Sequence, residues 1–114
     1  MRSKHLSPSS PSTAALFDLL GRRWALRVLW ELRDAEASFQ ALHERCDSMS
    51  TSVLSQRLRE LRAAGLVDAE KGGPYRLSEH GRVLLDQLRW VDEWTRTWSA
   101  ALGGAIDTRE TKPR

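Results

Sequence analysis

Apolar residues recur at helical spacing in the middle of the chain and leave the opposite side of that segment polar. Leu54, Leu58 and Leu61 fall at positions i, i+4 and i+7, so at about 3.6 residues per turn they share one side. Ser50 precedes this run as a predicted N-cap, and Gly65 follows it as a predicted left-handed stop. The pattern predicts a helix over about residues 50–64 with one face anchored in a core.

Helical spacing also appears on both sides of this segment. The predicted helices begin at Ser12 or Thr13 and end at Leu20, run from about Arg23 to Arg33, run from Phe39 to Cys46, and run as one long helix from Ser78 to about Leu102. Two short extended runs, Leu66–Glu70 and Tyr75–Ser78, flank Lys71-Gly72-Gly73-Pro74, a link typical of a β-hairpin. A further extended piece is expected at Ala37-Ser38.

This order predicts a mainly α-helical winged helix-turn-helix with a small β-hairpin. The elements follow as helix, helix, short strand, helix, helix, two hairpin strands and a final helix. Residues 12–102 are expected to form the domain, between a disordered arm at 1–11 and a disordered tail at 103–114. In such a fold the helix over 50–64 would enter the DNA major groove and the hairpin would be the wing.

The outward face of the predicted recognition helix has chemistry suited to DNA. Arg59 can bind guanine through two hydrogen bonds, Gln56 can read adenine or bridge through water, and Ser52 and Ser55 can meet phosphates. Arg57 lies on the flank, where a salt bridge and a phosphate contact are equally good expectations. The alternatives are a solvated surface helix, or a winged helix that binds another protein. The net charge of +3 permits DNA without requiring it.

Composition narrows the remaining function classes. The single cysteine excludes an internal disulfide, and with three scattered histidines it forms no zinc-binding pattern. No catalytic constellation or phosphate-binding loop appears, so neither an enzyme nor a cofactor is expected. The sequence has no signal-peptide pattern and no apolar run of about 20 residues. A cytoplasmic protein of 114 residues without membrane contact is therefore expected.

Tryptophans mark the last predicted helix. Trp90, Trp94 and Trp98 are each four residues apart and belong to an apolar stripe broader than one small domain needs. We expect them to serve the core and a dimer interface, in which aromatic residues are favoured. A pocket for a flat aromatic effector between the dimer helices is the alternative. The residues expected at the interface are Leu16, Phe17, Trp90, Val91, Trp94, Trp98 and Leu102.

Several sequence stretches, spread over residues 14 to 98, together resemble one family. They are LGRRW at 20–24, Phe39-x-x-Leu42 with Met49-Ser50, LSQRLREL at 54–61 followed by AGLV at 64–67, and Tyr75-x-Leu77-Ser78-x-x-Gly81-Arg82 with Trp94. In these stretches the chain resembles the HxlR-type transcriptional regulators, winged helices related to the MarR group. The resemblance implies a homodimer that binds a pseudo-palindromic operator through two recognition helices and regulates transcription, often as a repressor.

Positions carried over from this resemblance give the expected DNA contacts. They are Ser50, Thr51, Ser52, Ser55, Gln56, Arg59 and Arg23, with Lys71 and Arg76 as the basic residues of the wing. Arg22 and Arg23 together are candidates to clamp the DNA backbone.

The chain also departs from the family pattern. It has no cysteine before the first helix, its wing is short, and Cys46 stands where the family usually has leucine. Cys46 is either an inert buried thiol or a redox switch.

Overall fold

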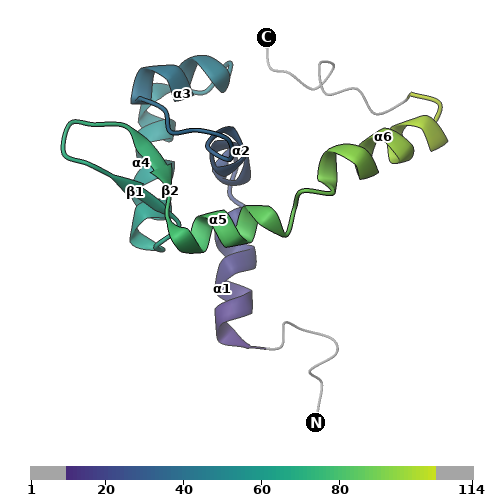
Figure 1. Cartoon of the computed structure of the whole chain (residues 1–114), viewed down its shortest axis with the longest axis horizontal. Helices are drawn as coiled ribbons and strands as arrows, with labels where there is room; N and C mark the ends of the chain where they lie inside the picture. The colour runs from purple at the N-terminus through teal and green to yellow at the C-terminus, as the bar shows by residue number, and fades with distance from the viewer. Residues whose placement is uncertain (1–9, 105–114) are drawn as a thin grey trace.

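The computed structural model describes residues 10–104 and has the predicted winged helix-turn-helix architecture (Figure 1). Helices pack around a small core, and a two-stranded hairpin extends from one side. Most of the predicted arm, residues 1–9, and most of the predicted tail, residues 105–114, lie outside the described residues. The elements are α1 (Pro11–Leu20), α2 (Ala25–Glu31), α3 (Phe39–Arg45), α4 (Thr51–Ala63), β1 (Val67–Ala69), β2 (Tyr75–Leu77), α5 (Glu79–Asp86) and α6 (Val91–Ala101).

Serine hydroxyls cap the N-terminal ends of four helices. Ser50 Oγ accepts a hydrogen bond from the Val53 backbone N–H at 3.1 Å, which confirms the predicted start of α4. The hydroxyls of Ser10, Ser38 and Ser78 act in the same way on α1, α3 and α5. The predicted start of α1, at Ser12 or Thr13, was two or three residues too late, because Ser10 is the cap and Pro11 has a backbone angle suited to the first helical position.

Helix α2 is shorter than predicted because the backbone turns left-handed at Trp24. This residue has φ +77°, so the helix begins at Ala25 and not at Arg23. A bulky side chain rarely adopts this conformation, and the surrounding packing must hold it there. The indole of Trp24 packs against the core.

The hairpin is antiparallel and is joined by the expected extended piece. Val67 pairs with Leu77, and Ala69 pairs with Tyr75. Ala37 and Tyr75 exchange two backbone hydrogen bonds of 2.8 and 2.9 Å, so the chain before α3 lies beside β2. Gly72 supplies the positive φ that the hairpin turn requires.

The predicted anchoring face of α4 forms the centre of the core. Leu54 and Leu61 are fully buried and Leu58 is 2% exposed. They belong to one cluster with Leu29 of α2 and Leu42 of α3. Helix α4 ends as predicted, since Gly65 has φ +78°.

The α4–β1 corner packs closely against the start of α5. A Cβ atom at Gly81 would lie 2.2 Å from the Leu66 carbonyl oxygen, so only glycine fits there. Ser78 Oγ donates to the Gly65 carbonyl oxygen at 2.6 Å and accepts from the Gly81 N–H. Glycine is a poor helix former, but at position 81 it is a packing requirement.

The prediction of one long C-terminal helix was wrong. Two helices, α5 and α6, are separated by a turn over residues 87–90, where Leu88 and Val91 bond to carbonyls three residues back. Leu85 of α5 is buried in the body, whereas α6 has no buried residue. Figure 1 shows α6 extending away from the other elements. Its tryptophans are therefore not part of the protomer core, contrary to part of the expectation.

Candidate nucleic-acid interface

The outward face of α4 is exposed to solvent. The buried leucines on the opposite face hold the helix in this orientation. Serines and threonine gather at the N-terminal end, and an amide and a guanidinium follow one and two turns later. Ser50, Thr51, Ser52, Gln56 and Arg59 are exposed, and Ser55 is half-buried. The structure thus brings together on one helix every DNA-contact candidate predicted there.

A groove runs between α4 and the hairpin, and three arginines line it. Arg59 and Arg62 come from α4, and Arg76 comes from β2. Arg62 was not among the sequence candidates, although its basic side chain one turn after Arg59 was a usable signal. Arg76 also pairs with Glu70 at 3.5 Å. Helix α4 and strand β2 therefore both place arginine side chains at this groove.

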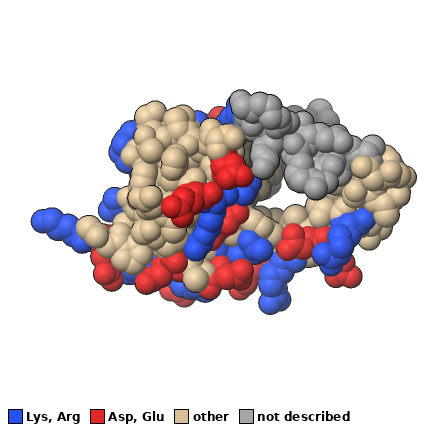
Figure 2. All heavy atoms as spheres, turned by 90° about the horizontal axis from the view of Figure 1, so that it is seen from above, with Lys and Arg blue, Asp and Glu red and all other residues tan. Residues whose placement is uncertain are grey.

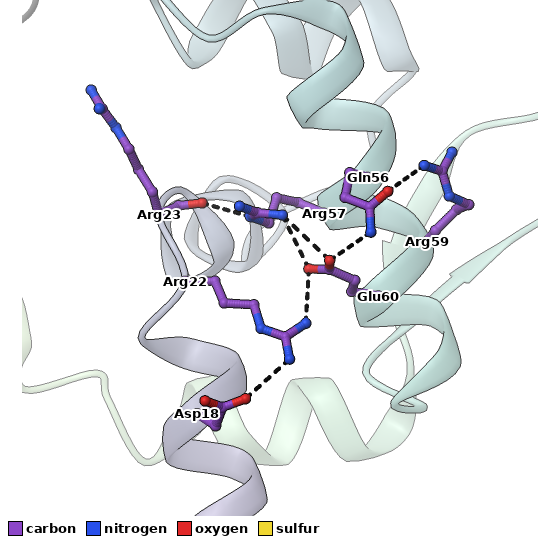
Figure 3. Close-up of polar contacts among 7 residues, drawn as sticks. All are labelled: Asp18, Arg22, Arg23, Gln56, Arg57, Arg59 and Glu60. Carbon is purple, nitrogen blue, oxygen red and sulfur yellow. Dashed lines mark hydrogen bonds and ion pairs between the residues drawn. The ribbon is translucent and has the colours of Figure 1, made fainter.

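Lys71 and Arg23 lie apart from this groove. Lys71 is exposed in the turn of the hairpin and borders a second hollow between the hairpin and α3. Arg23 lies in the α1–α2 link, with its guanidinium carbon 5.6 Å from the centre of the Trp24 ring. In Figure 3 its side chain points away from the other labelled side chains.

A polar network centred on Glu60 joins α4 to the end of α1 (Figure 3). Arg22 Nη1 lies 3.3 Å and Arg57 Nη1 lies 3.2 Å from Glu60 Oε1, and Gln56 Nε2 donates to Oε2 at 2.7 Å. Arg22 also pairs with Asp18 at 3.0 Å. The Glu60 side chain is 18% exposed, so these contacts are partly shielded from solvent.

Arg57 makes the salt bridge that was one of its two expected roles. Its Nε donates to the Arg23 backbone carbonyl at 2.7 Å while Nη1 pairs with Glu60. The Arg57 side chain is 19% exposed. One guanidinium thus fastens the recognition helix to the α1–α2 link, directly before the left-handed Trp24.

Hydrogen bonding lowers the pKa of the Glu60 carboxyl below its usual range. The bond from the Gln56 amide is the largest cause. Burial opposes it as the second-largest effect, and the hydrogen bond from Arg22 and the charges of Arg57 and Arg22 lower the pKa further. Glu60 is therefore ionised at neutral pH and can only accept hydrogen bonds.

Cys46 has the properties of an inert thiol. It is fully buried in the core cluster and has no disulfide. Burial raises the pKa of the Cys46 thiol, which suppresses the reactive thiolate at neutral pH. The first of the two expectations for this residue therefore agrees with its surroundings.

Three further kinds of feature in the described residues would bear on function: a continuous basic surface, a metal site and a membrane-spanning helix. Lys and Arg are interspersed with Asp and Glu on the face that Figure 2 shows, so no single basic field covers that face. Within residues 10–104 no group of three or more histidine, cysteine or acidic side chains could hold a metal ion. None of the helices described is both long and apolar enough to cross a bilayer.

Comparison with known proteins supports the winged helix-turn-helix architecture. The model of the HxlR-like helix-turn-helix family matches residues 19–102. The HTH-type transcriptional regulator YvaP of Bacillus subtilis is 28% identical over 98 residues, which are 81% of this chain and 91% of that protein. A second B. subtilis regulator, YybR, is 27% identical over 99 residues, covering 80% and 79%.

Solved structures give the same result. Quinone-bound YodB from B. subtilis has a TM-score of 0.69 and 27% identity, with 77% of this chain and 98% of that chain covered. The redox regulator HypR in its reduced form has a TM-score of 0.69 and 28% identity, covering 82% and 98%. The family assignment favours DNA binding over the protein-interaction alternative and over an enzyme. The chain belongs to the HxlR-like helix-turn-helix family and is a DNA-binding transcriptional regulator.

Proposed function

We propose that this regulator acts as a homodimeric repressor on a pseudo-palindromic operator, with α4 of each protomer in the major groove. The observation that carries the proposal is the outward face of α4, where Gln56 and Arg59 stay exposed while Leu54 and Leu58 hold the helix in the core. A major groove admits a helix presented in this way. A repressor of this kind acts where the chromosome lies, so we propose a cytoplasmic location.

The proposed contacts divide into those that position the protein and those that read sequence. The N-terminal end of α4 favours phosphate, because it carries the positive end of the helix dipole and the exposed hydroxyls of Ser50, Thr51 and Ser52. Arg59 lies farther along the face and is proposed to reach a base edge. The proposed phosphate contacts are Ser50, Thr51, Ser52, Ser55, Arg23, Lys71 and Arg76.

Exposed aromatic surface supports the homodimer. Phe17 on α1 is 60% exposed, and Trp90 and Trp94 are 54% and 51% exposed. The Trp94 and Trp98 rings stack with centroids 5.2 Å apart, which forms a continuous apolar strip. Contiguous apolar surface of this kind marks an interaction site. The proposed interface also includes Leu16, Val91 and Leu102.

Symmetry explains how α1 and α6 can share an interface although they diverge within one protomer (Figure 1). In a two-fold contact, Phe17 of one copy can meet α6 of the other, and the reverse contact forms at the same time. Each protomer would then bury both of its exposed apolar elements against its partner.

A small planar aromatic effector is proposed as a ligand of the paired α6 helices. Exposed indole rings offer stacking faces for such a molecule. Among the structural neighbours, YodB has been determined with bound quinone. Titration of the dimer with planar aromatic compounds, followed by tryptophan fluorescence, tests this part.

Selection from a randomised duplex pool tests the main proposal. We expect enrichment of inverted repeats with half-sites one helical turn apart, binding that weakens steeply with added salt, and a dimeric mass by light scattering. A promoter reporter that rises when the protein is removed would support repression. Enrichment of no sequence, or a monomer that binds DNA tightly, would contradict the proposal.

A further inference from the structure

On the outward face of α4, the Gln56 side chain is hydrogen-bonded on one side to an acid, Glu60, and on the other to a base, Arg59. Its Nε2 donates to Glu60 Oε2 at 2.7 Å, and its Oε1 accepts from Arg59 Nη2. Glu60 and Arg59 are the fourth and third residues after Gln56, so all three lie on adjacent turns of α4. Figure 3 shows them as one chain of hydrogen bonds that continues to Arg22.

This chain gives the Gln56 amide one orientation. An ionised carboxylate only accepts hydrogen bonds, and a guanidinium only donates them. The amide nitrogen must therefore face Glu60 and the amide oxygen must face Arg59, since the reverse arrangement would place like groups against each other. The lowered pKa of the Glu60 carboxyl agrees with its fixed role as an acceptor.

We infer that Glu60 and Gln56 are positioning residues that orient Arg59 to select guanine in the operator. The inference rests on the proposed DNA contact of α4. An amide that reads adenine presents its N–H and its oxygen to the same base, whereas these two groups of Gln56 are directed to two different side chains. The free end of the chain is Arg59, which has only donors to offer.

Guanine is the base that matches a donor-only group. Its N7 and O6 are neighbouring acceptors on the major-groove edge, and a guanidinium can bind both at once. Gln56 restricts the guanidinium before DNA arrives, so less side-chain freedom is lost on binding. In this inference, support of Arg59 takes the place of the roles expected for Gln56 from the sequence, which were reading adenine or bridging through water.

Selection with the full-length chain and three variants tests the inference. Wild type is expected to enrich a G·C pair at one symmetric position in each half-site. Arg59→Lys keeps the charge but loses the planar fork, so preference for guanine at that position should fall by about tenfold or more. Gln56→Ala should weaken the same preference severalfold and leave preferences at other positions unchanged.

Glu60→Gln is the matched test of the fixed amide. Its side chain has the same size but can donate as well as accept, so the Gln56 amide loses its single orientation. We expect weaker guanine preference and increased tolerance of adenine at the same position. Circular dichroism and melting temperature report the fold of each variant. Gln56→Ala alters an exposed side chain and remains a valid test if Glu60→Gln fails to fold.

The outcomes separate this inference from the function on which it rests. If wild type enriches no sequence, the proposed operator binding fails and the inference fails with it. If wild type enriches inverted repeats but Gln56→Ala erases a preference for adenine at another position and spares the guanine, Gln56 is a reader. That result, or operators that lack a fixed G·C pair, would overturn the inference alone.

Discussion

Arg22, in the link directly after α1, contacts Glu60 in the third turn of α4, with 3.3 Å between Nη1 and Oε1. Arg57 contacts the same carboxylate from α4 and also binds the α1–α2 link through the Arg23 carbonyl. Two arginines from separate parts of the sequence therefore converge on one acid. The end of α1, which precedes the DNA-reading unit in the chain, is held to it by this acid.

Stability should depend on the ionisation of Glu60. Its folded-state pKa lies below the unfolded value of about 4.3, so the carboxylate stabilises the fold above that pH, and this contribution is lost as pH falls through the folded pKa. We expect Glu60→Gln to lower the melting temperature at pH 7, by an amount that shrinks below about pH 4. Thermal melts of both proteins from pH 7 to pH 3 measure this difference in melting temperature.

The control for this series is Glu36→Gln, which alters an exposed acid in the loop between α2 and α3. Its melting temperature should follow that of wild type throughout. A gap between Glu60→Gln and wild type that stays constant over the whole pH range would contradict the role given to the carboxylate.

Ser50 can be tested for two roles with two substitutions. Ser50→Ala removes the acceptor for the Val53 N–H and should cost about 1 kcal/mol of unfolding free energy. Ser50→Asp keeps a capping oxygen but adds a negative charge where phosphate is expected, so stability should be retained and DNA affinity should fall. Chemical denaturation and DNA titration separate the two effects. Equal DNA affinity for Ser50→Asp and wild type would place this end of α4 away from the DNA.

Gly81→Ala should destabilise the domain although alanine is the better helix former. The gain in helix propensity is about 1 kcal/mol. The new Cβ would meet the Leu66 carbonyl oxygen at 2.2 Å, and backbone displacement of this kind costs about 1–3 kcal/mol or more. A net loss in denaturant melts is expected. Val83→Ala, at a 53% exposed position of the same helix, is the control and should have little effect.

Trp94→Ala should weaken the dimer more than the protomer fold. The side chain is 51% exposed in the protomer and stacks on Trp98, so its main burial is proposed to come from the partner. Interface tryptophans often contribute about 2 kcal/mol or more, which corresponds to a dissociation constant raised about thirtyfold. Sedimentation equilibrium measures this change. Arg96→Ala alters another exposed side chain of α6 and should leave dimerisation near wild type.

Cys46 should resist thiol reagents in the native protein. Its fully buried side chain and raised pKa both oppose attack, so labelling should be slow under native conditions and rapid in denaturant. Cys46→Ala should bind DNA with or without a prior oxidant treatment. Rapid native labelling that also abolishes DNA binding would instead identify a redox switch.

Local sequence patterns predicted the elements in which buried residues recur at regular spacing along the chain. The spacing of Leu54, Leu58 and Leu61 was sufficient for α4, because all three residues face one core. Gly72 in a short polar link was sufficient for the hairpin turn. These features depend on residues close together in sequence, and periodicity detects them directly.

Features that depend on distant contacts could not be read in this way. The break between α5 and α6 leaves apolar residues at helical spacing on both sides, so the pattern resembles one helix. Arg57 binds a carbonyl 34 positions earlier in the chain, which no local spacing encodes. Position 81 must be glycine because the Leu66 carbonyl, which lies fifteen residues earlier in the chain, leaves no room for a side chain.

The turn over residues 87–90 leaves α6 with little contact to the rest of its own protomer. Energetic effects of substitutions at distant sites without shared partners usually add independently. If α6 forms the proposed dimer interface, substitutions on it should alter which chains associate while the proposed base recognition by α4 stays constant. Under the proposed function, the choice of partner and the choice of operator would then be set by two separate helices, α6 and α4.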